Sequence, residues 1–218
     1  VLSSTIHPQS PYKPDSTLFD FNGRVLNRFP YDFIDVCESS GEAVSVDFQH
    51  IWENRQGYGF KREFSDRSVS VTNLFTGRRE LSLAIDSDFN FLHPHAESFL
   101  NHIKFSPNGN FIFGFISENF PIRKNKCWIF DRRNQKFLLD ENWRQFEIIS
   151  HHCWLSDFEF LFFGFRKNGY NGYFILNIET QIFTEYCPKI RVDGHPTGYG
   201  AGIITDCYPS ILGLQSMW

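Results

Sequence analysis

Apolar residues in this chain are grouped in short stretches that turn-forming residues separate. The clearest stretches follow histidines: His102-Ile-Lys-Phe-Ser-Pro-Asn-Gly-Asn-Phe-Ile-Phe-Gly-Phe is one, and His152-Cys-Trp-Leu-Ser-Asp-Phe-Glu-Phe-Leu-Phe-Phe-Gly-Phe is the next. A third copy begins at His195, and the copies are spaced 50 and 43 residues apart. Ser-Pro-Asn-Gly is a turn signal between two apolar runs, so each copy predicts two antiparallel strands.

A second pattern of strand, turn and strand lies between these copies. It occurs at residues 18–24, 71–78, 128–136 and 174–181, where Asn-Gly and Thr-Gly pairs are direct hairpin signals. A further copy of the first pattern occupies residues 34–46, with Ile34 at the position of the histidines. Short strands with a period of roughly 40–50 residues indicate an all-β chain and a β-propeller, with one blade per period.

The repeat predicts one propeller domain over residues 1–218. Complete blades are expected at about 34–82, 102–139 and 152–186, and half blades at about 15–28 and 195–218. Propellers usually have about four to eight blades, so we interpret the chain as a fragment of a larger, about seven-bladed propeller. In the alternative, residues 17–27 complete the blade that begins at 195 and close a four-bladed ring. A fragment leaves an unpaired blade edge, which predicts poor solubility or dimerisation.

Composition narrows the class of protein. The chain has 26 Phe and one Met, and aromatic side chains favour strands and fill the space between sheets. The net charge of −4 offers no broad basic surface, so nucleic acid is not an expected partner. No apolar run is long enough to span a membrane, no signal peptide is recognisable, and no membrane partner is expected. The five cysteines form no CxxC pair and fit a cytoplasmic location.

The repeated histidines are the first candidates for chemistry. Equivalent positions in successive blades meet around one axis, so His102, His152 and His195 are predicted to approach the same end of the channel. Neutral imidazoles there can bind a divalent metal. Alternatively, the three histidines bond neighbouring blades and are structural. His151 and His152 point in opposite directions if the strand is regular, and the register with His102 favours His152.

Two segments resemble the bacterial oligogalacturonate-lyase-like group of TolB-like (WD40-like) propellers, which is often associated with polysaccharide gene clusters. They are Asp193-Gly-His-Pro leading into Thr205-Asp-Cys-Tyr-Pro, and Val44-Ser-Val-Asp-Phe followed by Asn54-Arg-Gln-Gly-Tyr-Gly-Phe. Asn101-His102 fits the same pattern, and the resemblance spans roughly residues 15–212. The chain departs from it at Gln56, where the family has Pro, and at residues 198–202, where the family has a Ser-Pro-Asp-Gly turn.

The resemblance implies a manganese-type divalent metal held by histidines near the axis, and a β-elimination that cleaves uronate-containing saccharides. In such a site Arg55 would hold the uronate carboxylate and Tyr58 would stack on a sugar ring. Asp206 either orients a ligand histidine through its second ring nitrogen or caps the turn before Pro209. His93 and His95 are interpreted as loop histidines.

The sequence thus favours a carbohydrate-active propeller, either a metal-assisted lyase or a protein that binds acidic oligosaccharide or polysaccharide. The alternative is a non-catalytic propeller that binds a protein partner, because the fold alone does not determine activity. Whether the chain is catalytic is left open at this point.

Overall fold

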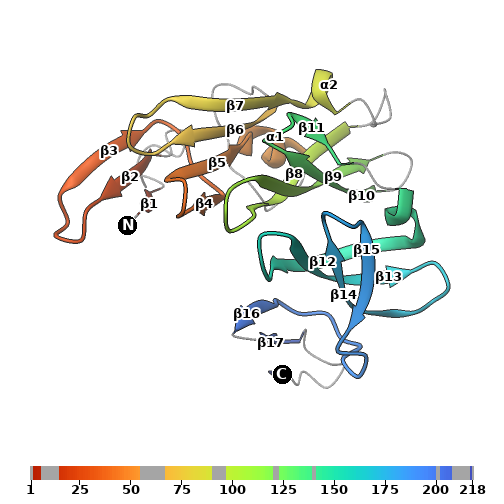
Figure 1. Cartoon of the computed structure of the whole chain (residues 1–218). Helices are drawn as coiled ribbons and strands as arrows, with labels where there is room; N and C mark the ends of the chain where they lie inside the picture. Colours follow the sequence, from red (N-terminus) through yellow and green to blue (C-terminus); the bar gives the residue numbers. More distant parts are fainter. Residues whose placement is uncertain are drawn as a thin grey trace. The chain divides into compact units, whose positions relative to one another are not determined.

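The computed structural model describes residues 2–5, 15–54, 67–89, 97–119, 123–138, 141–199, 202–207 and 217. The chain divides into two compact units, Val1–Lys136 and Phe137–Trp218, and each is described by itself. Both consist of antiparallel sheets in which consecutive strands are neighbours (Figure 1). No helix of the described residues is long and apolar enough to cross a membrane.

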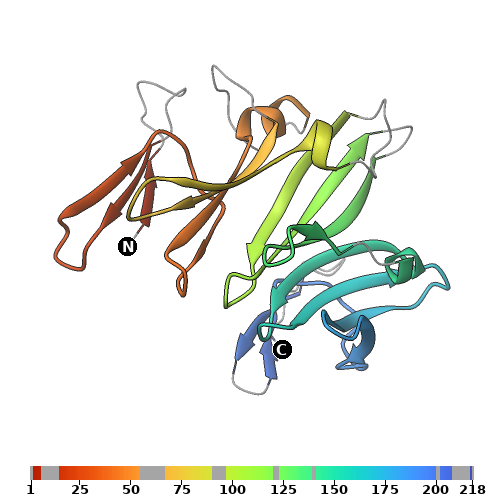
Figure 2. The ribbon, with the colours of Figure 1, turned by 45° about the horizontal axis from the view of Figure 1, so that its top comes forward.

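The first unit contains three sheets, which Figure 2 shows as successive ribbons. The first sheet has strands β1 (Leu2–Thr5), β2 (Asp15–Phe19) and β3 (Val25–Phe29). The second has β4 (Asp35–Cys37), β5 (Glu42–Val46), β6 (Ser68–Asn73) and β7 (Arg79–Ala84), with helix α1 (Phe48–Asn54) after β5 and helix α2 (Ile85–Asp88) after β7. The third has β8 (Glu97–Phe105), β9 (Phe111–Asn119), β10 (Arg123–Asp131) and β11 (Lys136–Phe137).

The second unit contains one four-stranded sheet and one hairpin. After the short 3-10 helix η1 (Glu141–Gln145), the sheet has β12 (Phe146–Trp154), β13 (Glu159–Arg166), β14 (Asn171–Asn177) and β15 (Ile182–Tyr186). The hairpin has β16 (Thr197–Tyr199) and β17 (Gly202–Ile204). An isolated bridge joins Asp206 to Met217.

The prediction of an all-β chain built from repeated antiparallel sheets is confirmed. All four predicted strand–turn–strand units are hairpins, namely β2–β3, β6–β7, β10–β11 and β14–β15. The four-stranded sheets span residues 35–84, 97–137 and 146–186, where blades were expected at 34–82, 102–139 and 152–186. Among the described strands, β2 pairs with β1 and β3, and β17 pairs with β16, so the described residues contain no pairing of residues 17–27 with the segment that begins at 195.

The central strands are buried on both faces, which is why they are almost continuously apolar. In β13 the five residues from Phe160 to Gly164 are all buried. One face of this sheet packs the rings of Phe146, Phe162 and Phe174 against each other. Gly164 is required there, because an added Cβ would lie 2.7 Å from the Phe146 ring. The repeated Phe-Gly-Phe of the sequence is therefore a packing feature.

Polar contacts join neighbouring sheets of the first unit. Arg132, in the turn after β10, donates two hydrogen bonds of 2.7 Å to the Glu42 carboxylate on β5 and one of 2.8 Å to the Gly109 carbonyl. Burial of Glu42 disfavours its ionised form, but the bonds from Arg132 outweigh this effect and hold the pKa of Glu42 below its ordinary value. The Phe105 N–H donates a 2.8 Å hydrogen bond to the Asp35 carboxylate on β4. Burial of this carboxylate outweighs the hydrogen bond and raises the pKa of Asp35 above its ordinary value.

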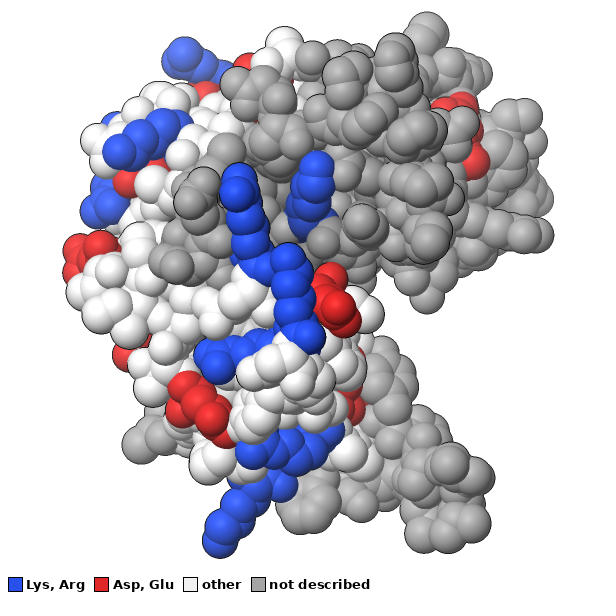
Figure 3. Space-filling model, turned by 90° about the vertical axis from the view of Figure 1, so that its right-hand side faces the viewer, with Lys and Arg blue, Asp and Glu red and all other residues white. Residues whose placement is uncertain are grey.

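Surface charges of both signs accompany this core. On the face that Figure 3 shows, Lys and Arg side chains are interspersed with Asp and Glu side chains among uncharged residues. This distribution agrees with the small net charge of −4.

We predict that Glu42→Gln lowers the free energy of unfolding by about 3 kcal/mol, because it leaves the half-buried Arg132 guanidinium without its carboxylate. Because the pKa of Glu42 is lower in the folded chain, the stabilisation is fully present above its ordinary pKa of 4.5 and is lost as the pH falls through the folded value. Urea unfolding at several pH values measures both effects.

The matched control is Glu80→Gln, which removes an exposed carboxylate 3.9 Å from Arg78 and is expected to change stability by less than about 1 kcal/mol. Equal losses in the two variants would contradict a specific role of the Arg132–Glu42 pair.

Candidate functional site

The alternation of side chains along β12 places His151 and His152 on opposite faces of the sheet. The pairing of β12 with β13 shifts between Ile149 and His152, which marks a β-bulge or an equivalent irregularity. Beyond it, the His152 ring lies 5.2 Å from the Phe160 ring, and His152 is only 5% exposed. The His151 ring lies instead 4.3 Å from the ring of His195, which follows the sheet in the chain. Cys153 and Leu155, the next two alternate positions after His151, pack in the same cluster as Ile203 of the hairpin, so His151 lies on the hairpin face and His152 on the opposite one.

His151 is held by a carboxylate. Its Nδ1 lies 3.2 and 3.3 Å from the two carboxylate oxygens of Asp193. The Ser150 hydroxyl donates a 2.6 Å hydrogen bond to the same carboxylate, and the Gly194 N–H donates another of 2.9 Å. Because an ionised carboxylate only accepts hydrogen bonds, the proton of this contact belongs to Nδ1 of His151.

His195 is held in the same way by Asp206. Its Nδ1 lies 3.1 Å from both carboxylate oxygens of Asp206, and its backbone N–H donates a 2.6 Å bond to Oδ1. First the backbone bond and then the side-chain bond from His195 hold the pKa of Asp206 below its ordinary value. Gly194 is required beside this pair, since an added Cβ would collide with the Asp206 carbonyl.

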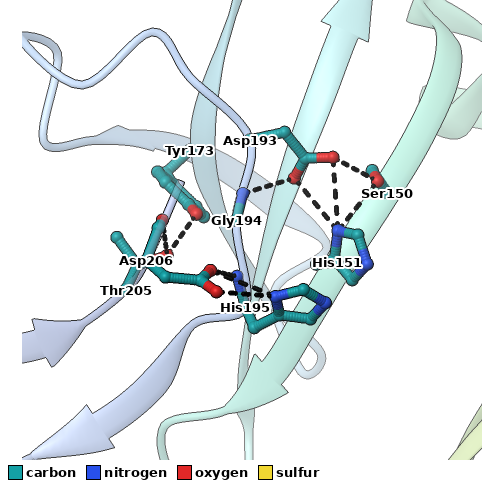
Figure 4. Close-up of polar contacts among 8 residues, drawn as sticks. All are labelled: Ser150, His151, Tyr173, Asp193, Gly194, His195, Thr205 and Asp206. Atoms are coloured by element: carbon teal, nitrogen blue, oxygen red, sulfur yellow. Dashed lines mark hydrogen bonds and ion pairs between the residues drawn. The ribbon is translucent and has the colours of Figure 1, made fainter. Parts of the chain in front are cut away.

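The two histidine–aspartate pairs form one site, which Figure 4 shows. Each Nδ1 faces its own carboxylate, and the other nitrogen of each ring lies toward the same side of the view. With the proton on Nδ1, the Nε2 of a neutral ring carries the lone pair that accepts a proton or binds a metal. The His195 side chain is 61% exposed and that of His151 is 18% exposed, so solvent reaches the site at His195.

Tyr173 anchors the segment that carries Asp206. Its hydroxyl lies 2.8 Å from the Thr205 hydroxyl, and the contact is buried. Burial, with a smaller contribution from the nearby Asp193 and Asp206, raises the pKa of Tyr173 to about 12. Tyr173 therefore stays protonated at neutral pH and acts here as a support for the chain that follows β17.

A cavity lies on the same side of β12 as the histidine pair. Its volume is about 570 Å³, within the usual range of about 300–1,000 Å³ for small-molecule sites. Side chains and backbone of β12, β13, β14 and β15 form one wall and the hairpin β16–β17 forms the other; the lining includes Cys153, Leu155, Glu159, Tyr186 and Thr197. The described lining residues do not include the two histidine–aspartate pairs, but Cys153 and Thr197 are each two residues from a histidine of these pairs.

The predicted site residues fall into three groups. His195 and Asp206 lie together as described, and Asp206 accepts hydrogen bonds from His195. His152 is in the aromatic core, and His102, on β8 of the first unit, has a positive φ of 52° with its ring 5.5 Å from Phe115. Arg55 and Tyr58 lie outside the described residues, as do His93 and His95. The proposed convergence of His102 with the other two histidines involves both units and stays a prediction.

Sequence reasoning missed His151 and Asp193. The motif Asp193-Gly-His-Pro contained one signal, because its aspartate and histidine each belong to one of the two pairs. The other signal was the adjacent pair His151 and His152. The match of register with His102 favoured His152, and the structure instead places His151 beside His195.

The donor set fits a metal only in part. A histidine that ligates a metal almost always donates its other ring N–H to a carboxylate or carbonyl, as His151 and His195 do. Within the described ranges, however, no group of three or more His, Cys, Asp or Glu is arranged to hold an ion. Two imidazoles alone do not complete a metal site.

Comparisons with known proteins identify the fold. No family model and no curated protein matches the chain. Among solved structures, TolB from Acinetobacter baumannii superposes with a TM-score of 0.55 at 12% sequence identity. The match covers 98% of this chain and 47% of the TolB chain. An oligogalacturonate lyase in complex with manganese superposes with a TM-score of 0.56 at 11% sequence identity. That match covers 94% of this chain and 58% of the lyase chain.

The chain therefore spans about half the length of these two structures. Both are β-propeller proteins, and their identities to this chain are low enough that the likeness concerns the fold alone. The predicted propeller architecture is confirmed: the sheets described above are propeller blades.

Proposed function

We propose that this chain belongs to a carbohydrate-active propeller that binds an acidic, uronate-containing oligosaccharide at His151 and His195 and cleaves it by β-elimination. The observation that carries the proposal is the contact of two imidazoles, each held at Nδ1 by its own carboxylate, with ring centres 4.3 Å apart. The likeness to an oligogalacturonate lyase supports the same substrate class.

The chemistry needs a base and positive charge. In β-elimination a base removes the proton next to the uronate carboxylate, the C–H electron pair forms a C=C bond, and the glycosidic C–O bond breaks with its electrons on oxygen. His195 is the better placed base, because it is the more exposed ring and Asp206 stabilises the imidazolium that forms. The leaving oxygen then takes a proton from the imidazolium of His195, which returns that ring to its neutral form, or from water.

A metal or an arginine would neutralise the uronate carboxylate and so acidify the neighbouring C–H. His151 and His195 are the described residues that would contact a divalent ion, and Arg55 remains the predicted cationic clamp. Because the described residues supply only two imidazoles, no step of this proposal passes through a metal.

Ser150 is not a nucleophile in this arrangement. A catalytic serine bonds to the histidine nitrogen opposite the aspartate. Here the Ser150 hydroxyl lies 2.6 Å from Asp193 and 3.2 Å from Nδ1 of His151, so all three groups meet at the same nitrogen. The geometry favours proton transfer by imidazole over acyl transfer by serine.

We predict that His195→Ala weakens binding of digalacturonate by about tenfold and abolishes formation of unsaturated product, because it removes both a polar contact and the base. Calorimetry measures the affinity, and ultraviolet absorbance of the unsaturated uronate measures cleavage.

The comparison variant is His152→Leu, which retains packing against Phe160 and is expected to bind digalacturonate as the unmodified chain does. An equal loss in both variants would favour the sequence prediction of His152 as the site residue. Absence of binding by a folded, unmodified chain would contradict the proposal and favour the protein-interaction module.

We also predict that Asp206→Asn reduces cleavage more than affinity, because the amide no longer fixes the proton of His195 on Nδ1 or stabilises the imidazolium. The pKa of Asp206 is lowered, so the His195–Asp206 contact stabilises the fold fully above the ordinary value of 3.8 and is lost only as the pH falls through the lower, folded value. Steady-state kinetics measure the change in cleavage rate and affinity, and an acid titration followed by NMR of the His195 ring measures the loss of the contact. An unchanged cleavage rate in the variant would contradict the role of Asp206.

A further inference from the structure

Two hairpin turns in the first unit share a pattern that the proposed site does not use. The turn between β2 and β3 reads Phe21-Asn-Gly-Arg24, and the turn between β6 and β7 reads Phe75-Thr-Gly-Arg78. Both therefore carry a phenylalanine, then a glycine, then an arginine at the same spacing. They are equivalent turns of neighbouring sheets.

Similar hydrogen bonds make the two turns rigid. In the first, the Asp20 carboxylate accepts from the N–H groups of Asn22 and Arg24, both at 2.9 Å. In the second, the Asn73 side-chain oxygen accepts from the N–H groups of Phe75 at 3.0 Å and Thr76 at 2.9 Å. Each glycine has the positive φ that closes the turn, 81° at Gly23 and 71° at Gly77.

Among the residues of this unit that the structure describes, the two phenylalanines are the most exposed large apolar side chains. Phe21 is 98% exposed and Phe75 is 71% exposed. The Phe75 ring rests on Gly41, where an added Cβ would lie 2.5 Å from it, so the orientation of this ring is set. The Arg78 side chain is 78% exposed, and Arg24 is exposed as well. Each rigid turn thus presents an aromatic ring and a guanidinium to solvent.

The equivalent turns of the other two complete blades lack this pair. The turn after β10 reads Arg132-Arg-Asn-Gln-Lys136, and the turn after β14 reads Ile178-Glu-Thr-Gln181. In both, a glutamine with positive φ, Gln135 or Gln181, takes the place of the glycine. The ring and the guanidinium are therefore not a requirement of the fold.

One contact limits the spacing of the two turns. The Asn27 side chain on β3 donates a 3.1 Å hydrogen bond to the Leu74 carbonyl, which lies in the second turn. Gly23 is four residues before Asn27, so the first turn lies at most about 13 Å along the chain from this contact at about 3.3 Å per residue. A chain of several monosaccharides spans such a distance.

We propose that these two turns bind a polymer of acidic sugars, each placing its phenylalanine against the apolar face of a sugar ring and its arginine on a uronate carboxylate. An arginine recognises a carboxylate through two parallel hydrogen bonds, and rigid turns lose little entropy on binding. Two like units on the protein match the repeating units of such a polymer, and linking two weak contacts raises the affinity for the polymer over that for its monomer.

A polysaccharide fits the turn tips better than an anionic membrane does. Asp20, Asn22 and Thr76 share the tips with the two phenylalanines, and insertion into a bilayer would remove these polar groups from water. Sugar hydroxyls can instead hydrogen-bond to them. This surface is separate from His151 and His195, which belong to the second unit.

The test uses the whole chain with polygalacturonate, galacturonate monomer and vesicles of phosphatidylserine and phosphatidylcholine. We expect the polymer to bind more tightly than the monomer. The double variants Phe21→Ala/Phe75→Ala and Arg24→Ala/Arg78→Ala are each expected to weaken polymer binding by about tenfold, and only the arginine variant to reduce its salt dependence.

The controls are Ile182→Ala, which removes another exposed apolar side chain, and Lys136→Ala, which removes a charge from the equivalent turn after β10; neither should alter polymer binding. His195→Ala should abolish cleavage yet leave polymer binding in place, which separates this proposal from that of the active site. Unchanged polymer binding in both double variants would overturn the proposal. Vesicle binding that depends on Phe21 and Phe75, without polymer binding, would overturn it in favour of a membrane surface.

Discussion

The sheet β12–β15 must be covered on both faces, and this constraint creates the candidate site. Its central strands bury apolar side chains on either side: Phe160 and Phe162 on one face, and Leu161 and Phe163 on the other. The hairpin β16–β17 contributes Ile203 to the second face, and Tyr173 reaches across to Thr205. Burial of about 25 cal/mol per Å² of apolar surface drives this packing. The segments that carry His195 and Asp206 are thereby fixed beside β12.

Paired charges make the resulting contact of two imidazoles stable. Two adjacent rings would repel each other when protonated, but Asp193 and Asp206 each face one ring through its Nδ1. The carboxylates also determine the tautomer, so both rings present Nε2 as the basic nitrogen. Two basic nitrogens held side by side suit a site that moves a proton, which the proposed elimination requires.

The sequence predicted the all-β fold and its hairpins because both depend on local signals. Phe-Gly-Phe runs and turns such as Asn22-Gly23 determine strands and hairpins within a few residues, and the structure has hairpins at each such place. His195 and Asp206 were found as site candidates from the motif around them, and the structure places them in contact.

The remainder of the site depends on features that periodicity does not contain. Strand alternation places His151 and His152 on opposite faces, but only the packing of Cys153 and Leu155 with Ile203 shows that His151 is the one that faces His195, and a long-range contact of this kind leaves no mark in the sequence. Asp193 lies 42 residues after its partner His151, so only the packing of the hairpin on β12 brings them together. Arg55 and Tyr58 lie outside the described residues, so their roles in substrate binding stay predictions.

The central claim is that His151 and His195 act as a pair of imidazoles with their protons on Nδ1 and Nε2 directed to an acidic sugar. NMR of the ring nitrogens in the ¹⁵N-labelled chain, before and after addition of digalacturonate, tests it most directly. We expect the Nδ1–H tautomer for both rings at neutral pH, and we expect the Nε2 signals of both rings to move when the sugar binds. A proton on Nε2 in the sugar-free chain, or Nε2 signals that the sugar leaves unchanged, would contradict it.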